Sequence, residues 1–295
     1  MSIQTLSSLL RRRLHEWGPS VNHQRELKEF YERADLEDRY ERQWGYGNSV
    51  AAEYWGMRDQ LVFDAINNKF GKQVGNIRAL EVGTGYGHEL AKLRRVGVAW
   101  ESLTGVDFLL PRLKRASESY PEVSFSLADA VALPFSDSLF DLVLQFTCVM
   151  HALTHDVQRA MCAEMIRVLR PGGMIVWWDL APLRWRTLCL RRFLFATSST
   201  AKLRDRATNI LQTFRELSSS TIRKESLQHC SSVTALLVDV GDVKPLFEKL
   251  DVRALRAGVD FEVWRSLWHR SPKLARLFWR SGYFSGHCFA TACKH

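Results

Sequence analysis

Short apolar runs that alternate with helical patterns constrain the fold of this 295-residue chain more than any other feature of its sequence. The expected strands are Ile77–Val82, Ser102–Val106, Val123–Leu127, Phe140–Phe146 and Met174–Asp179. The helical segments expected between them are Gly87–Arg95, Pro111–Ser119 and Asp156–Leu169. Continuous apolar strands separated by helices are typical of a parallel sheet that is covered on both faces. The pattern therefore predicts an α/β fold.

The texture of the sequence divides the chain into four parts. Residues 1–70 are rich in charged and aromatic side chains and predict an N-terminal helical cap, whereas residues 71–182 hold the alternating core. Residues 183–250 are expected to form a mostly helical insertion after the fifth strand, and the alternation returns in residues 251–295. The elements expected in this last part are a strand at Val252–Leu255, a helix at Phe261–Arg280 and a final strand at Phe284–Ala292.

The most informative segment of the core is LEVGTGYGHEL, residues 80–90, in which an expected strand runs into three glycines and a helix. Glycines at a strand-to-helix turn allow the backbone to bend sharply and let a ligand approach it closely. A dinucleotide-binding loop of the type GxGxxG would need a glycine at position 88, where His88 stands. Glu81 precedes the first glycine, and its carboxylate favours a cationic or amine-bearing ligand over a pyrophosphate. Alone, the loop is equally consistent with a tight turn in an unrelated α/β domain.

Two further acids follow the second and third expected strands. Asp107 stands 24 residues after Gly83, and an acid at the tip of the second strand can accept hydrogen bonds from both hydroxyls of a ribose. Asp129 is placed to accept a hydrogen bond from an adenine amino group, beside the backbone of Ala130. Because ligands of open α/β sheets bind outside the carboxyl ends of the strands, Glu81, Asp107 and Asp129 are expected to border a single site.

Four motifs in this order, LEVGTGYG, TGVD, LADAVALPF and VLRPGGMIVWWD, resemble those of the class I S-adenosylmethionine-dependent methyltransferases. The resemblance extends from about Ile77 to Pro182 and is to the small-molecule branch that includes the ubiquinone-biosynthesis type. It implies a Rossmann-like sheet of seven strands with an antiparallel last strand, and S-adenosyl-L-methionine as the cofactor. The closing phrase SGHCFATACK is also similar to bacterial members associated with glycan or secondary-metabolite biosynthesis, from which residues 183–230 depart by being longer and more basic.

The resemblance also implies roles for individual residues. Glu81 and the loop 83–87 would hold the methionine end of the cofactor, Asp107 its ribose, and Asp129 with its neighbour its adenine. The backbone carbonyl of Phe146, at the end of the fourth strand, would accept a hydrogen bond from the cofactor's amino group. The full set of expected cofactor-binding residues is Glu81, Gly83, Thr84, Gly85, Gly87, Asp107, Phe108, Asp129, Ala130 and Phe146.

Transfer of a methyl group from a sulfonium mainly requires alignment of the acceptor with that group, and a base only where the acceptor must lose a proton. His151 and, after it, His155 follow the fourth strand and are the candidate bases. The alternative for both histidines is a structural role, in which the side chain caps the next helix or packs against it. The (D/N)PPY motif of amino-group methyltransferases is absent, since residues 145–148 read QFTC. Its absence argues against methylation of adenine or glutamine amino groups. An oxygen acceptor is expected in preference to nitrogen or carbon.

Candidate acceptor contacts lie outside the cofactor motifs. Trp44 and Tyr46, together with Tyr54 and Trp55, would form an aromatic wall that faces the sulfonium. Packing of the N-terminal helices onto the core is the alternative for these four aromatic residues. Cys148 lacks the Pro-Cys context of a cytosine C5-methyltransferase nucleophile and is interpreted as a buried thiol.

The positive charge of the chain lies entirely in its last third. Residues 1–182 contain 21 Lys and Arg against 23 Asp and Glu, whereas residues 183–295 contain 20 against 9. A solvated basic face on structural helices is one reading, and an anionic or lipid-linked acceptor, a membrane surface or a nucleic acid are the others. Nucleic acid is the least favoured, because no RNA-binding module is visible. Arg184 and Arg186, at the start of the insertion that we expect to cover the acceptor, are candidate substrate contacts.

Together these observations predict methyl transfer to a small or lipid-linked, anionic acceptor. The alternatives are a non-catalytic scaffold that binds the cofactor and an RNA methyltransferase that uses the basic last third. No Cys or His residues have the spacing of a zinc site, so no metal is expected. The sequence has no signal-peptide pattern and no apolar run of about 18 residues, so a cytoplasmic protein, free or peripheral at the membrane, is expected. Nothing in the sequence indicates an oligomeric state.

Overall fold

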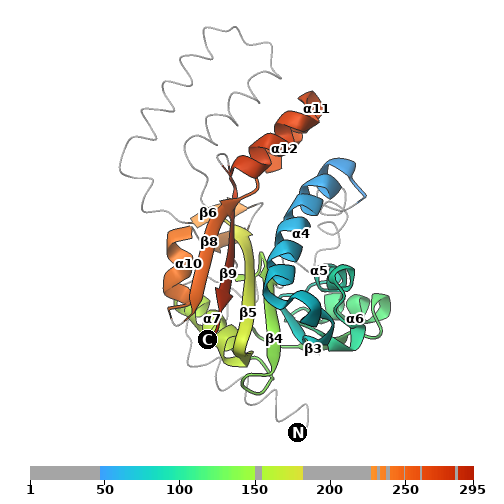
Figure 1. Ribbon diagram of the computed structural model, residues 1–295, viewed down its shortest axis with the longest axis vertical. Coiled ribbons are helices and arrows are strands. Elements are labelled where there is room, and N and C mark those ends of the chain that lie inside the picture. The colour runs from blue at the N-terminus through green and yellow to red at the C-terminus, as the bar shows by residue number, and fades with distance from the viewer. Residues whose placement is uncertain are drawn as a thin grey trace.

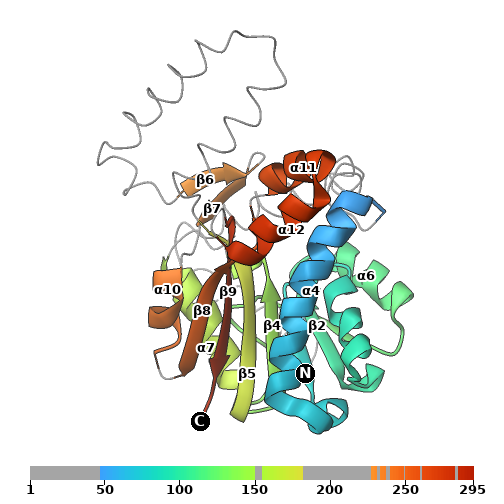
Figure 2. The ribbon, with the colours of Figure 1, turned by 45° about the horizontal axis from the view of Figure 1, so that its top comes forward.

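A central sheet with helices on both faces organises the computed structural model, which describes residues 47–149, 155–181, 227–230, 233–236, 240–248, 250–259, 261–282 and 285–295 (Figures 1 and 2). Within these residues the sheet has seven strands in the order β3-β2-β1-β4-β5-β9-β8. Their bounds are β1 Ala79–Val82, β2 Leu103–Asp107, β3 Ser124–Leu127, β4 Phe140–Phe146, β5 Leu169–Leu180, β8 Asp251–Ala257 and β9 His287–Cys293. The predicted α/β fold, with seven strands and an antiparallel last strand, is confirmed.

The direction of β9 determines what lies at the functional end of the sheet. The strands β3, β2, β1, β4 and β5 are parallel, and β9 runs antiparallel between β5 and β8. The first residue of β9, His287, therefore pairs with Leu180 near the end of β5. We call the edge at which the parallel strands end the carboxyl edge. The start of β9 lies at this edge, beside the ends of β4 and β5.

Helices cover the two faces of the sheet unequally (Figures 1 and 2). The helices are α4 Ser49–Phe70, α5 His88–Ala91, α6 Leu110–Ser119, α7 His155–Val168, α10 Val240–Leu246, α11 Phe261–Arg270 and α12 Pro272–Ser281, with 3-10 turns η1 Gly71–Asn76, η2 Lys92–Val96 and η3 Trp100–Ser102. Residues of α4, α11 and α12 belong to one apolar core, and residues of α7 and α10 to the other. Alternate side chains of β5 serve the two cores, since Val176 and Trp178 lie in the first and Ile175 and Trp177 in the second.

Local sequence explains the length of α4. The side chain of Asn48 caps its start, because Oδ1 accepts hydrogen bonds from the backbone N–H of Val50 at 3.0 Å and of Ala51 at 3.4 Å. Gly71, with φ of 51°, follows its last residue. Buried side chains recur at helical spacing along one stripe, namely Val50, Ala51, Tyr54, Trp55, Arg58, Asp59, Val62, Phe63, Ile66 and Phe70. This stripe fixes α4 against the sheet and turns two charged residues inward.

Two elements differ from the sequence-based expectation. The single helix expected at residues 261–280 is wrong, because Ser271 caps a new helix and Pro272 is its first residue. Proline lacks a backbone N–H and is favoured at the first helical position, so the chain stops and restarts there. Within the insertion expected to be mostly helical, β6 Leu227–Cys230 and β7 Val233–Leu236 form an antiparallel pair. Residues 182–226, which make up most of that insertion, lie outside the described residues.

Candidate functional site

Three adjacent strands bring predicted site residues to the carboxyl edge. Glu81 lies in β1, Asp107 ends β2 and Phe146 ends β4. Strand β1 pairs with β2 on one side and with β4 on the other, and Glu81 is in register with Gly105 and Leu144. The topology therefore places these side chains around the loop that follows β1.

The glycine loop after β1 is held against β2 by backbone hydrogen bonds. The N–H groups of Gly83 and Thr84 donate to the carbonyl of Val106 at 2.8 and 2.9 Å. Gly83 has φ of 75°, and a Cβ at this position would lie 2.5 Å from the Sγ of Cys148. Gly85 and Gly87 also have positive φ. The first glycine is thus required both by its backbone conformation and by a close neighbour.

Asp107 fixes the loop from the side of β2. Its carboxylate is 6% exposed and accepts hydrogen bonds from the N–H of Gly85 at 2.8 Å and of Leu109 at 2.9 Å. Next to it, Phe108 is 37% exposed, and Leu127, the register partner of Asp107 on β3, is 56% exposed. A carboxylate bordered by exposed apolar side chains fits a ligand that joins a sugar to a flat base, so these residues fit the adenosine part of S-adenosylmethionine.

Glu81 is a buried carboxylate whose charge is partly compensated. It is 2% exposed, Oε2 accepts a hydrogen bond from the hydroxyl of Thr84 at 2.7 Å, and the charge of Arg58 and a backbone hydrogen bond of Leu90 also favour the ionised form. Burial, followed by the negative charge of Glu89, raises the pKa of Glu81 well above its ordinary value. A cation brought next to Glu81 would reverse this effect, so the position favours a positively charged ligand.

The other two predicted contacts lie in tight turns. The carboxylate of Asp129 accepts a hydrogen bond from the N–H of Val131 at 3.1 Å, and Ala130 is half-buried between them. The carbonyl of Phe146 accepts a hydrogen bond from the hydroxyl of Thr147 at 2.8 Å, and Thr147 has φ of 51°. A β-branched residue in the left-handed region is strained, and such strain is often found at functional sites.

The turn after β4 is stabilised by a buried amide. Oε1 of Gln145 accepts hydrogen bonds from the N–H of Cys148 at 3.1 Å and of Val149 at 3.3 Å, and its Nε2 donates to Asp179 at 3.4 Å. Burial, followed by the charge of Asp107, raises the pKa of the Cys148 thiol well above its usual range. The thiol therefore stays protonated, which argues against a nucleophilic role.

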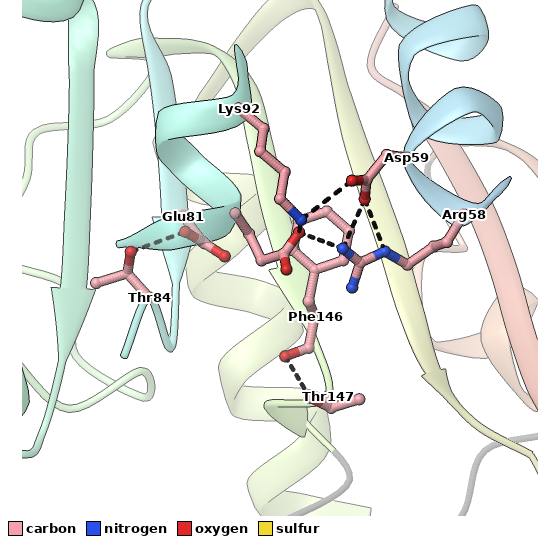
Figure 3. Close-up of polar contacts among 8 residues, drawn as sticks. Arg58, Asp59, Glu81, Thr84, Lys92, Phe146 and Thr147 are labelled. Carbon is pink, nitrogen blue, oxygen red and sulfur yellow. Dashed lines mark hydrogen bonds and ion pairs between the residues drawn. The ribbon is translucent and has the colours of Figure 1, made fainter. Parts of the chain in front are cut away.

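Sequence reasoning missed a group of four charged residues, which we call the charge cluster: Arg58, Asp59, Glu89 and Lys92. Figure 3 labels Arg58, Asp59 and Lys92 of this cluster. Arg58 pairs with both carboxylates, and Lys92 lies 2.8 Å from Glu89 and 3.1 Å from Asp59. The carboxylates raise the pKa of Arg58 above its ordinary value in spite of burial, which alone would lower it. A signal was present in the sequence, because Arg58 and Asp59 occupy core-facing positions of α4.

Several residues predicted to bind the acceptor or act as a base either make structural contacts or lie outside the described residues. His155 is the exposed first residue of α7, with Nδ1 3.2 Å from Oε1 of Gln158, the kind of local helix contact considered as the alternative to a base. Tyr54 and Trp55 are buried and pack against Phe261, which supports the packing alternative. The remaining candidates lie outside the described residues, namely Trp44, Tyr46, His151, Arg184 and Arg186.

Among the described residues, no group of three or more His, Cys, Asp or Glu side chains is placed to hold a metal ion. Nor does any helix in the described ranges combine the length and the apolar character that crossing a membrane requires.

Comparison with known proteins agrees with this geometry. Residues 79–173 match the family model described as a methyltransferase domain. Phthiotriol/phenolphthiotriol dimycocerosates methyltransferase 1 of Mycobacterium ulcerans is 36% identical over 107 residues, 36% of this chain and 38% of that protein. Demethylmenaquinone methyltransferase of Renibacterium salmoninarum is 32% identical over 117 residues, 40% of this chain and 45% of that protein. The matching stretch thus spans less than half the length of these two curated relatives.

The fold has well-matched neighbours among solved structures. Magnesium protoporphyrin IX methyltransferase from Synechocystis PCC 6803, determined with bound SAH, superposes with a TM-score of 0.54 over 92% of this chain and 100% of that chain, at 14% identity. The PH0226 protein from Pyrococcus horikoshii OT3 superposes with a TM-score of 0.51 over 87% and 99%, also at 14% identity. Residues 79–173 thus match a methyltransferase domain, and the sheet order agrees with the fold of these methyltransferase neighbours.

Proposed function

We propose that this protein transfers the methyl group of S-adenosylmethionine to a small or lipid-linked acceptor, with an oxygen atom of the acceptor favoured over nitrogen or carbon. The observation that carries the proposal is the buried carboxylate of Asp107 at the end of β2, which accepts hydrogen bonds from the glycine loop and is bordered by exposed apolar side chains. S-adenosylmethionine supplies a methyl group that is already activated by its attachment to a sulfonium. The protein's own contribution is binding and alignment.

The residues of the carboxyl edge divide this task. The methionine end of the cofactor would be held by Glu81, Gly83, Thr84, Gly85 and Gly87. The carboxylate of Glu81 favours the positive charge of that part of the cofactor. Asp107 and Phe108 would hold the ribose and one side of the adenine, Asp129 and Ala130 would hold the adenine edge, and the carbonyl of Phe146 would accept from the amino group. His151 stays the candidate base for an acceptor that must lose a proton, and Trp44, Tyr46, Arg184 and Arg186 stay candidate acceptor contacts.

The class of acceptor is proposed from the relatives and from charge. The two relatives described above are named for a phthiotriol dimycocerosate and for demethylmenaquinone, and another, of Penicillium expansum, is named an O-methyltransferase. The absence of (D/N)PPY after β4 and the basic last third of this chain agree with an anionic acceptor that is methylated on oxygen.

The binding test uses calorimetry with S-adenosylhomocysteine. Asp107→Ala should weaken binding by about 1.5–3 kcal/mol, because it removes hydrogen bonds to a charged group. Asp137→Ala is the matched control, since the Asp137 side chain is 76% exposed and paired with Arg167 on the surface. Absence of binding by the unsubstituted protein would refute the proposal.

Turnover is tested separately with radiolabelled methyl donor and fractionated metabolite extracts. The proposal expects label in an extractable small or lipid-like product, which base hydrolysis releases if the product is an ester. Label that enters only RNA would favour the RNA methyltransferase alternative. Cofactor binding without label in any fraction would favour a scaffold.

We also propose that α11 and α12 contact an anionic membrane surface that holds the acceptor. Residues 261–282 contain five Lys and Arg and one acid, and on α12 Leu274 and Leu277 are 38% and 61% exposed. Basic residues around exposed leucines suit an interfacial helix. The helices lie near the carboxyl edge (Figure 2).

Vesicle flotation tests this contact. Binding to vesicles that contain phosphatidylglycerol is expected to fall with Leu277→Glu and to fall as the phosphatidylglycerol is replaced by phosphatidylcholine. Lys114→Gln on α6 is the control for charge alone, because it changes the net charge by the same amount as Leu277→Glu. Equal flotation of all three proteins would contradict the proposed contact.

A further inference from the structure

A cavity of about 540 Å³ lies beside α5 and η2, on residues that the proposed function does not use. Its described lining comes from the residue before the cap of α4, from α5, η2 and η3, and from the residue that follows α6. None of the residues proposed to bind the cofactor is among these lining residues. The lining residues that carry a titratable group or an aromatic ring are His88, Lys92, Arg94, Arg95, Trp100 and Tyr120.

The charge that faces this cavity has one sign. Arg94 and Arg95 are exposed, Lys92 is half-buried, and no acid is among the described lining residues. Within the described part of the chain, no carboxylate forms an ion pair with Arg94 or Arg95, whereas Lys92 pairs with the two acids of the charge cluster. Burial, followed by the charge of Arg95, lowers the pKa of Lys92 to about 7. An anion in the cavity would offset this crowding of positive charge.

Both arginines are held by neighbouring groups of the fold. Nη1 of Arg94 donates to the carbonyl of Val98 at 2.5 Å, and its Cζ lies 5.3 Å from the ring centroid of Trp100. The Cζ of Arg95 lies 5.7 Å from the ring centroid of Phe63, on α4. A guanidinium has five N–H donors, so the bond to Val98 leaves donors for a ligand. Because the two side chains are already positioned, a ligand pays less for ordering them.

Two aromatic rings give the cavity a wall for an apolar body. The rings of Trp100 and Tyr120 stack at an angle of 24°, with their centroids 6.0 Å apart, and both residues are half-buried. The hydroxyl of Tyr120 lies 3.0 Å from Nδ1 of His88, which is exposed. Flat rings next to a few convergent polar groups are typical of sites for small organic ligands.

We propose that this cavity is a second ligand site, beyond the proposed function, and that it binds an organic anion in which an aromatic ring carries a phosphate or carboxylate group. Arg94 and Arg95 bind the anionic group, since a guanidinium matches both oxyanions with paired hydrogen bonds. Trp100 and Tyr120 contact the ring. Inorganic phosphate lacks the ring and a neutral ring lacks the charge, so each should bind more weakly than a molecule that has both.

The binding experiment is calorimetry with 2-naphthyl phosphate in the presence of saturating S-adenosylhomocysteine, which keeps the probe out of the proposed cofactor site. The expected result is one bound probe per chain. Inorganic phosphate and 2-naphthol, which represent the charge and the ring alone, should each bind at least about tenfold more weakly.

Substitutions locate the probe on the surface. Arg94→Gln and Arg95→Gln should each weaken its binding about three- to tenfold, because each removes a charge-assisted but solvent-exposed contact. Trp100→Leu should weaken binding of 2-naphthyl phosphate and leave that of inorganic phosphate unchanged. Arg276→Gln is the matched control, since Arg276 also lies over a tryptophan, 5.2 Å from the ring centroid of Trp268, but pairs with Glu53 at 2.7 Å. The control should stay within twofold of the unsubstituted protein.

Four results would overturn the proposed site: no binding of 2-naphthyl phosphate, equal affinity for 2-naphthol, binding that S-adenosylhomocysteine abolishes, or unchanged affinity when both arginines are replaced together. Circular dichroism establishes that each variant is folded, and the arginine variants carry the test if Trp100→Leu does not fold. Binding of S-adenosylhomocysteine is measured first and separately. If it fails, the proposed function fails, and the cavity is still tested with the same probe alone.

Discussion

Two buried polar regions lie one helical turn apart on α4, and they treat charge in opposite ways. The first, which we call the aromatic core, consists of Tyr54, Trp178, Trp264, Trp279 and His287. The second is the charge cluster around Arg58. Both join α4 to residues far away in the sequence, and both are withdrawn from water.

The aromatic core pairs the polar atoms of Tyr54, Trp264 and His287 without charge, whereas the indole N–H groups of Trp178 and Trp279 are buried without a hydrogen-bond partner among the described residues. The hydroxyl of Tyr54 donates to the carbonyl of Val259 at 2.8 Å, so the 2.9 Å contact with Nδ1 of His287 requires the imidazole to donate. Burial, followed by the charge of Arg58, lowers the pKa of His287 to about 3. The imidazole also stacks on Trp178, with ring centroids 4.8 Å apart. A neutral histidine suits a region whose task is to hold the fold together.

The charge cluster instead consists of charged groups that pair with one another. Arg58 has two carboxylate partners of unequal burial, since the side chain of Asp59 is 6% exposed and that of Glu89 is 23% exposed. One turn of α4 is therefore built from neutral groups and the next from charged ones. Substitutions should separate the stability of the fold from cofactor affinity.

The largest effect is expected for Trp264→Ala. Trp264 is fully buried, packs against Tyr54 and donates its Nε1–H to the carbonyl of Val50 at 2.9 Å. Its loss should reduce the free energy of unfolding, measured with urea, by about 3–5 kcal/mol. Cofactor affinity of the molecules that stay folded should be unchanged. Trp268→Ala, at a half-buried neighbouring ring, should cost less; equal costs would contradict the distinction between core and periphery.

Gly83→Ala should follow, and it should reduce both stability and cofactor affinity. The new Cβ would meet the Sγ of Cys148 at 2.5 Å in a backbone conformation with φ of 75°. The left-handed conformation costs about 1–2 kcal/mol and the crowding about 1–3 kcal/mol. Gly85→Ala is the matched control, because φ is 54° there but the space is open. Denaturant unfolding and calorimetry should show a larger loss for Gly83→Ala, and the reverse order would contradict the packing.

His287→Asn should have the smallest effect at neutral pH and should change the pH dependence of stability. The unfolded chain protonates this histidine below about pH 6.5, whereas the folded protein does not until about pH 3. Unfolding therefore takes up a proton in this window, and its free energy falls as the pH is lowered. The contribution is about 1.4 kcal/mol per pH unit. The difference between the two proteins should show this slope, and parallel stability curves would refute the neutral histidine.

The sequence was sufficient where a feature depends on local pattern. Apolar runs located the five strands of the parallel part, and the glycines and Asp107 lie at the edge where the motifs put them. The break between α11 and α12 has a local signal in Ser271 and Pro272, but the apolar spacing continues through it and favours a single helix. The strand pair at residues 227–236 lies in the stretch LQHCSSVTAL, which has no clear period.

Features that depend on tertiary contact could not be predicted in this way. Arg58 meets Glu89 across 31 positions and Tyr54 meets His287 across 233. Neither pair has a sequence spacing that indicates contact. Only the docking of α4 against the sheet, together with the reversed direction of β9, brings these groups together.

The position of β9 also has a consequence for how the molecule reaches its native state. Strand β5 has β4 on one side and β9 on the other, and β9 is followed in the sheet by β8. During synthesis the parallel strands emerge first, but the backbone N–H and C=O groups on one edge of β5 have no partner strand until residues 287–293 are available. Such long-range pairing is slow, and an unpaired strand edge promotes aggregation. We therefore expect β5 to be the segment that depends most on chaperones in the growing chain.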